Sequence, residues 1–298
     1  MMGTTMGTTM GTTTRGGWMA SRLRGGLLMA ALAGLVGLAG CTTTTTTTSS
    51  NDVARGPSPT VTSRPDLLTE SDEPESRRRA RVRLQLASGY FEQGQTSVAL
   101  DETKQTLAID PTFADAYNLR GLIFMRLNDQ RLAEDSFRRA ISLNPREANT
   151  LHNYGWLVCT QGRYAEADQL FNEALANPTY GGRAKTFMAQ GLCQQSAGKL
   201  PEAERTLARA YELDAGNPIT GFNLASLLFQ RGELVRAQFY IRRLNNSELA
   251  NAESLWLGIK VEQRMGNTEA VQQLSEQLRK RFGQSKEMAS YERRAFNE

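Results

Sequence analysis

The sequence predicts an all-α protein made of stacked helix-turn-helix units, and three observations support this fold class. The same pattern of residues returns every 33 to 36 positions from about residue 80 to the C-terminus, and a fixed period of about 34 is typical of helical repeats. Small residues and turn-forming residues fall at the same places in each period. Beyond about residue 75 the composition shifts to Ala, Leu, Arg, Glu and Gln, which favour helices. Stacked units of this kind bind other chains and seldom catalyse reactions, so the pattern favours an interaction protein.

The first 40 residues are expected to be a low-complexity prefix followed by a secretion signal. Arg-Leu-Arg at 22–24 precedes an apolar run at 27–40, and Cys41 follows directly. The run is too short to cross a bilayer core of about 30 Å. This order is typical of a bacterial lipoprotein signal, which is cleaved before a cysteine that takes a diacylglyceryl group. We therefore predict lipidation of Cys41, with an uncleaved signal anchor as the alternative. Residues 1–17 only repeat Met-Gly-Thr-Thr, so translation from Met19 is a second interpretation of the start.

Residues 41–73 are rich in Thr, Ser, Pro and Asp and should form a disordered tether, because they cannot bury an apolar core. About 33 residues of flexible chain reach roughly 30 Å, which would let the folded part stand away from the membrane surface. Aspartate after a lipidated cysteine is the usual signal for retention in the inner membrane of enterobacteria. Thr42 occupies that place, so we expect the outer membrane, with the folded part on its periplasmic face.

Residues 74–298 should fold as six units, each with two helices joined by a tight turn. The first position of each unit falls at Ala80, Ala114, Ala148, Ala184, Pro218 and Asn251. The turns inside the units fall at residues that accept a positive φ, namely Gly94, Asn128, Gly162, Gly198, Gly232 and Gly266. Four second helices end at Asp-Pro or Asn-Pro pairs, which are Asp110-Pro111, Asn144-Pro145, Asn177-Pro178 and Asn217-Pro218.

Two positions of each unit carry small residues, as expected where the two helices cross at about 8–10 Å. The eighth is Ala87, Gly121, Gly155, Gly191, Ala225 and Gly258, and the twentieth is Ala99, Ala133, Ala167, Ala203, Ala237 and Ala270. Extra residues at 180–182 lengthen the link between the third and fourth units. The first and sixth units depart from the pattern, as terminal caps do. We expect one more helix at about 287–297.

This pattern resembles the tetratricopeptide repeat over about residues 80–282, and the resemblance implies a right-handed superhelix. It also implies that positions 2, 5, 9 and 12 of each first helix line a concave groove. The groove residues would then be Asn118, Leu122 and Met125 in repeat two, His152, Trp156 and Cys159 in repeat three, and Met188 and Leu192 in repeat four. We expect an apolar groove for a partner's helix or strand, with Asn118 and His152 bonding to its backbone. The alternative is that Trp156 and Leu122 mainly pack on the next repeat.

The sequence offers no catalytic or cofactor chemistry. His152 is the only histidine, so a histidine-based metal site is excluded, and no nucleotide-binding or hydrolase motif appears. No enzyme activity and no cofactor are therefore expected. Cys159 and Cys193 lie in neighbouring repeats, where helices about 8–10 Å apart exceed the disulfide limit of about 7 Å. We expect two free thiols, with a bridge as the alternative.

The net charge of +4 is modest, and both signs alternate along the repeats. A mixed surface of this kind does not indicate nucleic-acid binding. The exception is the basic run at 77–83. It is interpreted either as the exposed first turns of a helix or as a contact with anionic lipid headgroups or an acidic partner.

A more specific resemblance lies in Asn153–Tyr164, which reads NYGWLVCTQGRY. It is similar to the segment NNYGxFLCxQGRY of the type IV pilus biogenesis lipoproteins, PilF and PilW. The stretches 177–180, 225–240 and 254–266 fit as well. His152, where that family commonly has Asn, and the bulkier Trp156 depart from the pattern.

The resemblance implies a pilotin: an outer-membrane lipoprotein that helps a PilQ-like pilus secretin reach the membrane and assemble into its ring, and so permits twitching motility. We expect a monomer whose partners are the secretin and, through its lipid, the membrane. The alternative is another outer-membrane lipoprotein scaffold with these repeats, acting in β-barrel assembly or in the regulation of peptidoglycan enzymes.

Overall fold

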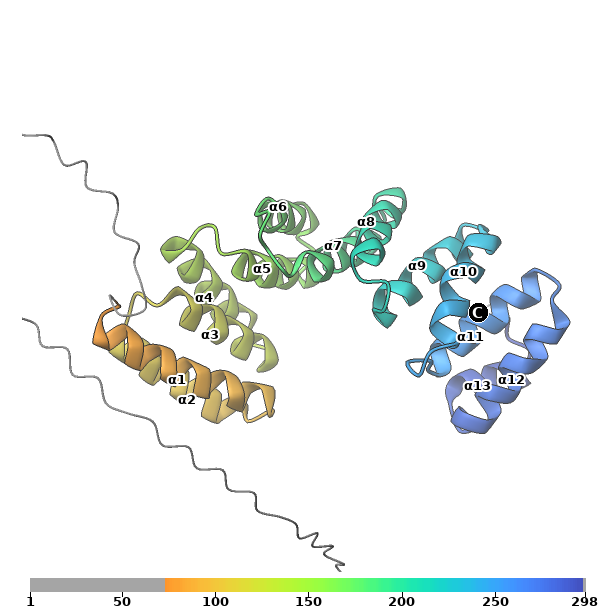
Figure 1. Cartoon of the computed structure of the whole chain (residues 1–298), viewed down its shortest axis with the longest axis horizontal. Helices are drawn as coiled ribbons and strands as arrows, with labels where there is room; N and C mark the ends of the chain where they lie inside the picture. Colours follow the sequence, from red (N-terminus) through yellow and green to blue (C-terminus); the bar gives the residue numbers. More distant parts are fainter. Residues whose placement is uncertain (1–72, 297–298) are drawn as a thin grey trace, which may run out of the picture. The chain divides into compact units, whose positions relative to one another are not determined.

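The computed structural model describes residues 73–296, all of which belong to one compact unit. These residues form thirteen helices and no strand, and the helices follow one another as antiparallel neighbours (Figure 1). Their bounds are α1 Glu75–Glu92, α2 Thr96–Ile109, α3 Ala114–Arg126, α4 Gln130–Leu143, α5 Ala148–Thr160, α6 Tyr164–Leu175, α7 Arg183–Ser196, α8 Leu200–Leu213, α9 Pro218–Gln230, α10 Leu234–Asn245, α11 Ala252–Arg264, α12 Thr268–Phe282 and α13 Lys286–Glu292. The signal, Cys41 and the tether lie outside the described residues.

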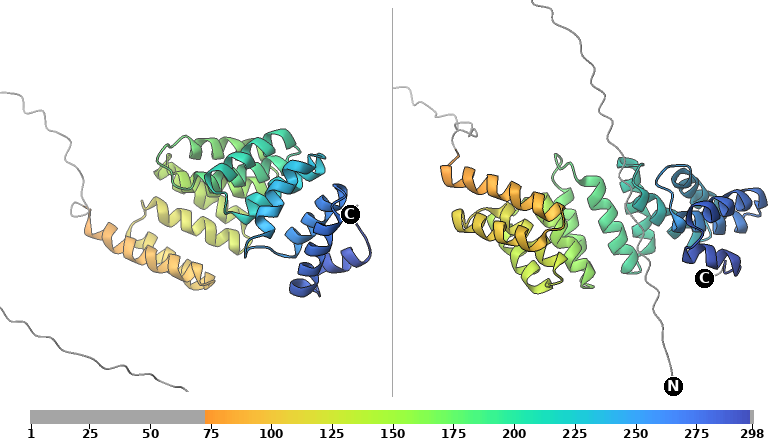
Figure 2. Two further views of the ribbon diagram at one scale, coloured as in Figure 1. Left: turned by 45° about the vertical axis from the view of Figure 1, so that its right-hand side comes forward. Right: turned by 90° about the horizontal axis from the view of Figure 1, so that it is seen from below.

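The first twelve helices pair as six hairpins, and first helices of neighbouring hairpins contact each other in the pairs α1 with α3, α3 with α5, α5 with α7 and α9 with α11. Figure 2 shows this succession from two further directions. The prediction of an all-α array of six helix-turn-helix units is therefore confirmed. The final helix, α13, begins close to its predicted start but ends at Glu292, earlier than expected.

All six predicted turn residues adopt a positive φ. The glycines at 94, 162, 198, 232 and 266 have φ between 74° and 79°, and Asn128 has φ 59°. A residue with this conformation ends each first helix and turns the chain back within three residues. The left-handed conformation favours Gly and, among other residues, Asn. The same turn can therefore be read from two residue types.

Small residues at the eighth position permit the predicted close crossing within a unit. A Cβ atom on Gly121 would lie 2.5 Å from the ring of Phe137, and one on Gly155 would lie 2.9 Å from the ring of Phe171. Both rings are fully buried. The aromatic ring thus fills the space that the missing side chain leaves on the facing helix.

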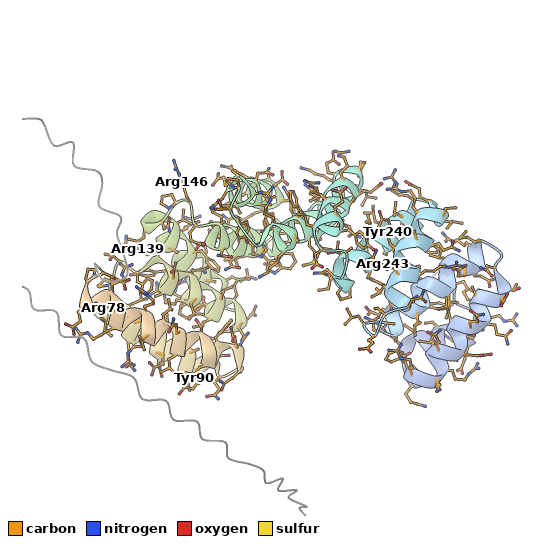
Figure 3. All side chains as sticks on the ribbon, viewed as in Figure 1. Arg78, Tyr90, Arg139, Arg146, Tyr240 and Arg243 are labelled. Carbon is orange, nitrogen blue, oxygen red and sulfur yellow. A yellow bond between two sulfur atoms is a disulfide. The ribbon has the colours of Figure 1, made fainter. Side chains whose placement is uncertain are left out.

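Side chains from successive units fill the space between them (Figure 3). At two junctions an arginine at the end of one first helix lies over a phenylalanine ring of the preceding first helix. Arg126 lies 3.6 Å from the centroid of Phe91 and donates to its carbonyl, and Arg264 lies 4.2 Å from the centroid of Phe229. Phe91 and Phe229 are both at the twelfth position of their repeats. These pairs join neighbouring units near the ends of their first helices.

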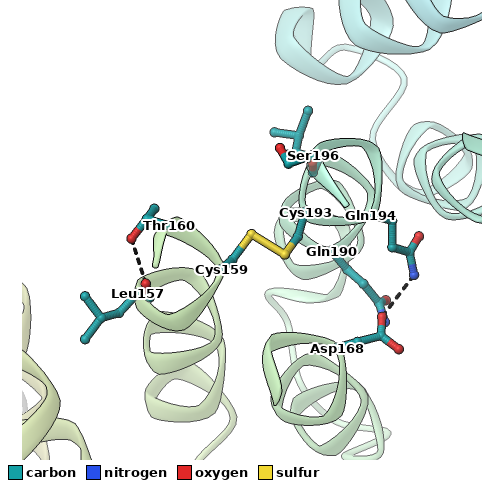
Figure 4. Close-up of a disulfide and its surroundings, with 9 residues drawn as sticks. Leu157, Cys159, Thr160, Asp168, Gln190, Cys193, Gln194 and Ser196 are labelled. Atoms are coloured by element: carbon teal, nitrogen blue, oxygen red, sulfur yellow. Dashed lines mark hydrogen bonds between the residues drawn. A yellow bond between two sulfur atoms is a disulfide. The ribbon is translucent and has the colours of Figure 1, made fainter. Parts of the chain in front are cut away.

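Two further neighbouring units are joined by a disulfide between Cys159 of α5 and Cys193 of α7 (Figure 4). The expectation of two free thiols is therefore wrong. The two Cα atoms are 5.9 Å apart, within disulfide range. The spacing of about 8–10 Å describes helix axes, whereas Cα atoms lie about 2.3 Å from their axis. Two residues on facing sides of neighbouring helices can consequently come within bonding distance.

The C-terminal end is closed by an aromatic cluster. The ring of Trp256 lies 5.4 Å from that of Phe296 and 6.5 Å from that of Tyr291. Trp256 is only 8% exposed, because α13 covers the open side of α11. This cap has no counterpart at the other end of the array, where α1 is the first described helix.

The helices of the array are neither membrane spans nor carriers of a metal cluster. Between residues 73 and 296, no helix has both the length and the apolar character needed to cross a bilayer. Within the same range, no three His, Cys, Asp or Glu side chains gather as a metal site would require.

Candidate partner-binding surface

The predicted groove residues lie on three neighbouring helices, α3, α5 and α7, which contact one another in sequence. Within each helix they are spaced by three or four residues and so share one face. The α3 members are Asn118, Leu122 and Met125, the α5 members are His152, Trp156 and Cys159, and the α7 members are Met188 and Leu192. These eight residues differ sharply in how far solvent reaches them.

Trp156 is the exposed member of the set. Its side chain is 37% exposed, whereas its neighbours Gly155 and Leu157 are buried. Tryptophan buries a large area and is enriched among residues that dominate binding energy at interfaces. The partly exposed side chain of Trp156 on the middle helix, α5, is therefore available to contact a partner.

The aliphatic members on α3 and α7 are half-buried. Leu122 and Met125 pack against the buried cluster that contains Phe137 and Leu157, and Leu192 packs against the next cluster, which contains Leu207. For Leu122 the packing alternative therefore holds in part. Part of each of the three side chains still reaches the surface.

His152 is buried between repeats three and four. It is 5% exposed, and a hydrogen bond of 2.9 Å joins its Nδ1 to Oγ1 of Thr186, which in turn donates to Oη of Tyr180 at 3.2 Å. Burial, together with the charge of Lys185, lowers the pKa of His152 to about 4. His152 is thus a neutral contact between repeats, and any hydrogen bond to a partner must come from other side chains. Cys159, 7% exposed and bridged to Cys193, is also withdrawn from the surface.

The side-chain NH₂ group of Asn118 is available to donate a hydrogen bond. Its Oδ1 accepts a hydrogen bond of 3.0 Å from Nδ2 of Asn153 on α5. In the described part of the chain, its own Nδ2 has no acceptor. This amide can therefore donate to a backbone carbonyl of a bound segment.

Cross-links between the three helices hold the surface in place. The bond between Asn118 and Asn153 joins α3 to α5, while the disulfide and the contact of His152 with Thr186 join α5 to α7. Side chains held in this way lose little further conformational freedom when a partner binds.

A polar network that the repeat pattern did not predict joins α5 to α4 and α6. Tyr154 accepts a hydrogen bond from Arg138 and donates to Glu134, and Arg163 bridges Glu134 and Glu166 at 2.6–2.8 Å. Burial would raise the pKa of Glu134, but hydrogen bonds from Arg163 and Tyr154 outweigh it and lower that pKa. The sequence signal was the Tyr154 and Arg163 pair inside the Asn153–Tyr164 segment, since both residue types need partners when they are shielded from water.

Comparison with known proteins identifies the same repeat and, in addition, a relative that shares most of the repeats. A tetratricopeptide repeat family model matches residues 114–147. The type IV pilus assembly protein PilF of Pseudomonas aeruginosa is 32% identical over 178 residues, which cover 60% of this chain and 71% of that protein.

Two solved structures resemble the fold over most of their length. The structure titled "Functional Characterization of Pseudomonas Aeruginosa pilF" superposes with a TM-score of 0.67 at 28% identity, covering 74% of this chain and all of the other. That of PilW, described as a widely conserved type IV pilus biogenesis factor, gives a TM-score of 0.65 at 29% identity, covering 71% and 97%. On the identity and coverage of these matches, the chain belongs to the PilF/PilW family of tetratricopeptide-repeat proteins of type IV pilus biogenesis.

Proposed function

We propose that this protein is an outer-membrane lipoprotein that binds the pilus secretin and promotes its localisation and multimerisation. Family membership supports a role in pilus biogenesis. The observation that carries the binding part is Trp156, 37% exposed on a surface whose three helices are joined by a disulfide and hydrogen bonds.

The chemistry of this surface fits an amphipathic segment of a partner. Trp156 offers an apolar contact, and the half-buried Leu122, Met125 and Leu192 lie on the neighbouring helices α3 and α7. Asn118 offers an amide donor for a backbone carbonyl. Subunits of a multimeric ring would expose apolar segments before the ring closes, and apolar surface exposed in this way aggregates unless it is covered. A fixed apolar surface with a polar donor would cover one.

Attachment of the protein to the membrane is the second part of the proposal. Cys41 follows a short apolar run and would carry the lipid. The residues between it and α1 would span roughly 30 Å if they are flexible. The lipid would supply the address, and the repeats would supply the partner-binding surface.

The proposal is tested by deleting the gene and measuring secretin multimers in isolated outer membranes. We expect the monomer to persist while multimers are lost, and the intact gene to restore them. Multimers at the parental level in the deletion strain would contradict the pilotin role. That result would favour a scaffold for another envelope assembly, which the same strain reveals through its β-barrel protein content and its peptidoglycan composition.

A further inference from the structure

The outward face of α1 carries apolar side chains where the internal repeats are covered by a preceding unit. Val82 is 67% exposed and Leu86 is 47% exposed. They occupy the third and seventh positions of repeat one. The third positions of repeats two to five, Ala116, Thr150, Thr186 and Thr220, are at most 1% exposed.

The seventh position follows the same rule in repeats three to five, where Tyr154, Gln190 and Leu224 are at most 5% exposed. A terminal unit has no preceding neighbour and normally presents a polar outer face to water. Repeat one presents valine and leucine instead. These two side chains line a shallow groove of about 740 Å³ together with Glu75, Arg78, Arg79, Arg83 and Ile109.

The charges beside this face are mostly basic, and Glu75 is the acidic residue on the same stripe, at the start of α1. With 3.6 residues per turn, Val82 and Leu86 lie on one stripe of α1, with Arg78 on one side of it and Arg79 and Arg83 on the other. Arg83 is held by Glu102 and Gln105 at 2.5 and 2.6 Å. Arg79 is 3.8 Å from Glu75, with both side chains largely exposed.

Arg78, which projects near the start of α1 (Figure 3), has no partner among the described residues. Arg77 behaves differently, since it turns back to bond Asp110 and Thr112 and covers the ring of Phe113. The outward stripe therefore combines an apolar centre with Arg78 and with Arg79, whose ion pair with Glu75 is exposed to solvent.

An apolar stripe with arginines on both sides is typical of a helix that lies in the interface of a membrane. The apolar side chains enter the headgroup boundary, and the guanidinium groups meet lipid phosphates. The place of α1 in the chain agrees with this occupant. It is the first described helix, and the chain before it contains an apolar run at 27–40 and Cys41.

We propose that the face of α1 formed by Arg78, Arg79, Val82 and Leu86 docks on an anionic phospholipid surface. A basic and apolar patch beside a lipid attachment is a common further contact with the membrane. Docking through α1 would keep repeat one at the membrane and leave α3, α5 and α7 free for a partner. The proposal concerns α1 alone and does not require the proposed lipid.

The test uses the chain from Thr42 to Glu298, which lacks the signal and the acyl group but retains every helix described. Its partitioning is measured by co-sedimentation with vesicles of phosphatidylcholine containing about 30% phosphatidylglycerol, and with vesicles of phosphatidylcholine alone. We expect binding to the anionic vesicles that falls as salt is raised. Loss of one or two arginines near an anionic surface lowers the affinity for it by about a factor of ten. Arg78→Gln with Arg79→Gln should therefore weaken the partitioning about tenfold or more. Val82→Ser with Leu86→Ser should weaken it by a similar factor.

Matched control variants remove the same groups elsewhere. Val235→Ser with Phe239→Ser changes two side chains that are 71% and 61% exposed on α10. Arg146→Gln with Arg205→Gln removes two exposed arginines outside α1. Both controls should partition like the parent chain, and circular dichroism should show all variants equally folded.

The docking proposal fails if the parent chain does not bind anionic vesicles, or if the α1 variants bind as tightly as the parent. Sedimentation velocity identifies another occupant. A concentration-dependent dimer that the Val82→Ser/Leu86→Ser variant loses, without vesicle binding, would assign the face to a second copy of the chain instead. Because the test chain carries no lipid, failure of the lipidation proposal would not alter this result.

Discussion

At the residue scale, three aromatic or polar side chains with similar sequence signals have different environments. Trp156 and Trp256 are both tryptophans in first helices, yet one is 37% exposed and the other 8%. His152 occupies a position predicted to face a partner, but the fourth repeat covers it. The neighbouring repeat or the capping helix α13, and not the residue type, decides which of these side chains can meet a partner.

Trp156→Ala should reduce secretin multimers in outer membranes while leaving the unfolding free energy within about 1 kcal/mol of the parent, because the side chain is only partly buried. Trp256→Ala is the matched control. It removes a buried ring from the aromatic cap and should destabilise the protein by about 3 kcal/mol or more. Thermal unfolding and multimer levels are measured for both. Equal losses of stability would mean that Trp156 is a core residue.

His152 predicts a pH dependence of stability. The folded-state pKa of His152 is about 4, and the unfolded value is about 6.5. The unfolded chain therefore binds more protons between these values, so the histidine's contribution is fully present above about pH 6.5 and is lost as pH falls toward 4.

Between about pH 7.5 and pH 5 the loss should be about 2 kcal/mol. Urea unfolding at the two pH values measures it. The only histidine is His152, so His152→Asn should remove this part of the slope and leave the part due to carboxyl groups. An unchanged slope in the variant would show that His152 titrates normally.

At the element scale, each unit depends on how closely its two helices approach and on how it joins the next unit. Glycine at the eighth position admits an aromatic ring of the facing helix. The disulfide of Cys159 and Cys193 ties α5 to α7, and arginines on phenylalanine rings serve the first and fifth junctions. The array is consequently joined at several places along one edge of its first helices.

Substitutions at two helical glycines distinguish the effect of close packing on stability from the effect of helix propensity. Gly121→Ala places a methyl group 2.5 Å from the ring of Phe137 and should destabilise the protein by about 1–3 kcal/mol. In Gly89→Ala the new methyl group meets nothing within 4 Å, and the variant should gain about 0.5–1 kcal/mol. Urea unfolding of the two variants measures both values. A stabilised Gly121→Ala variant would show that the ring can move away at no cost.

Removing the disulfide should lower stability through the unfolded chain. The bridge closes a segment with a sequence separation of 34 residues, for which chain entropy gives about 3–4 kcal/mol. Cys159→Ala with Cys193→Ala should lose about this amount in urea unfolding. A reducing agent should weaken the parent to the same level and leave the double variant unchanged. If the reducing agent has no effect on the parent, the thiols are not bridged in solution.

At the scale of the whole molecule, one chain contains a repeat array, a predicted lipid attachment and two different outward surfaces. The α3, α5 and α7 surface lies in the middle of the array, while the apolar and basic face of α1 is on the first described helix, which follows the predicted anchor in sequence. If both proposals hold, the protein would contact lipid at one end and its partner along the middle repeats.

Cys41→Ala should fold as the parent does, because the described helices lie beyond residue 73. It should nevertheless be lost from the outer-membrane fraction or retained there only weakly. Cell fractionation measures its distribution, and circular dichroism of the purified variant measures its fold. An unchanged distribution, with the outer membrane still holding the variant, would contradict lipid attachment at Cys41.

By itself the sequence determined the repeat. The period, the small eighth and twentieth positions and the six turn residues each depend on contacts or backbone angles inside a single unit. Such local requirements appear directly as residue types at fixed spacing. The residues of the Asn153–Tyr164 segment also indicate the family on their own, because they form one continuous stretch of the chain.

Only the tertiary structure decided what happens between units. The 5.9 Å approach of Cys159 and Cys193, the burial of His152 beneath Thr186 and the exposure of Val82 and Leu86 all depend on which neighbour is present and at what distance. Residues of equivalent position in the period are covered in the interior of the array and open at its end. A repeating pattern does not show which side chains the end of the array leaves exposed or on which side two helices face each other, because both are set by packing in three dimensions.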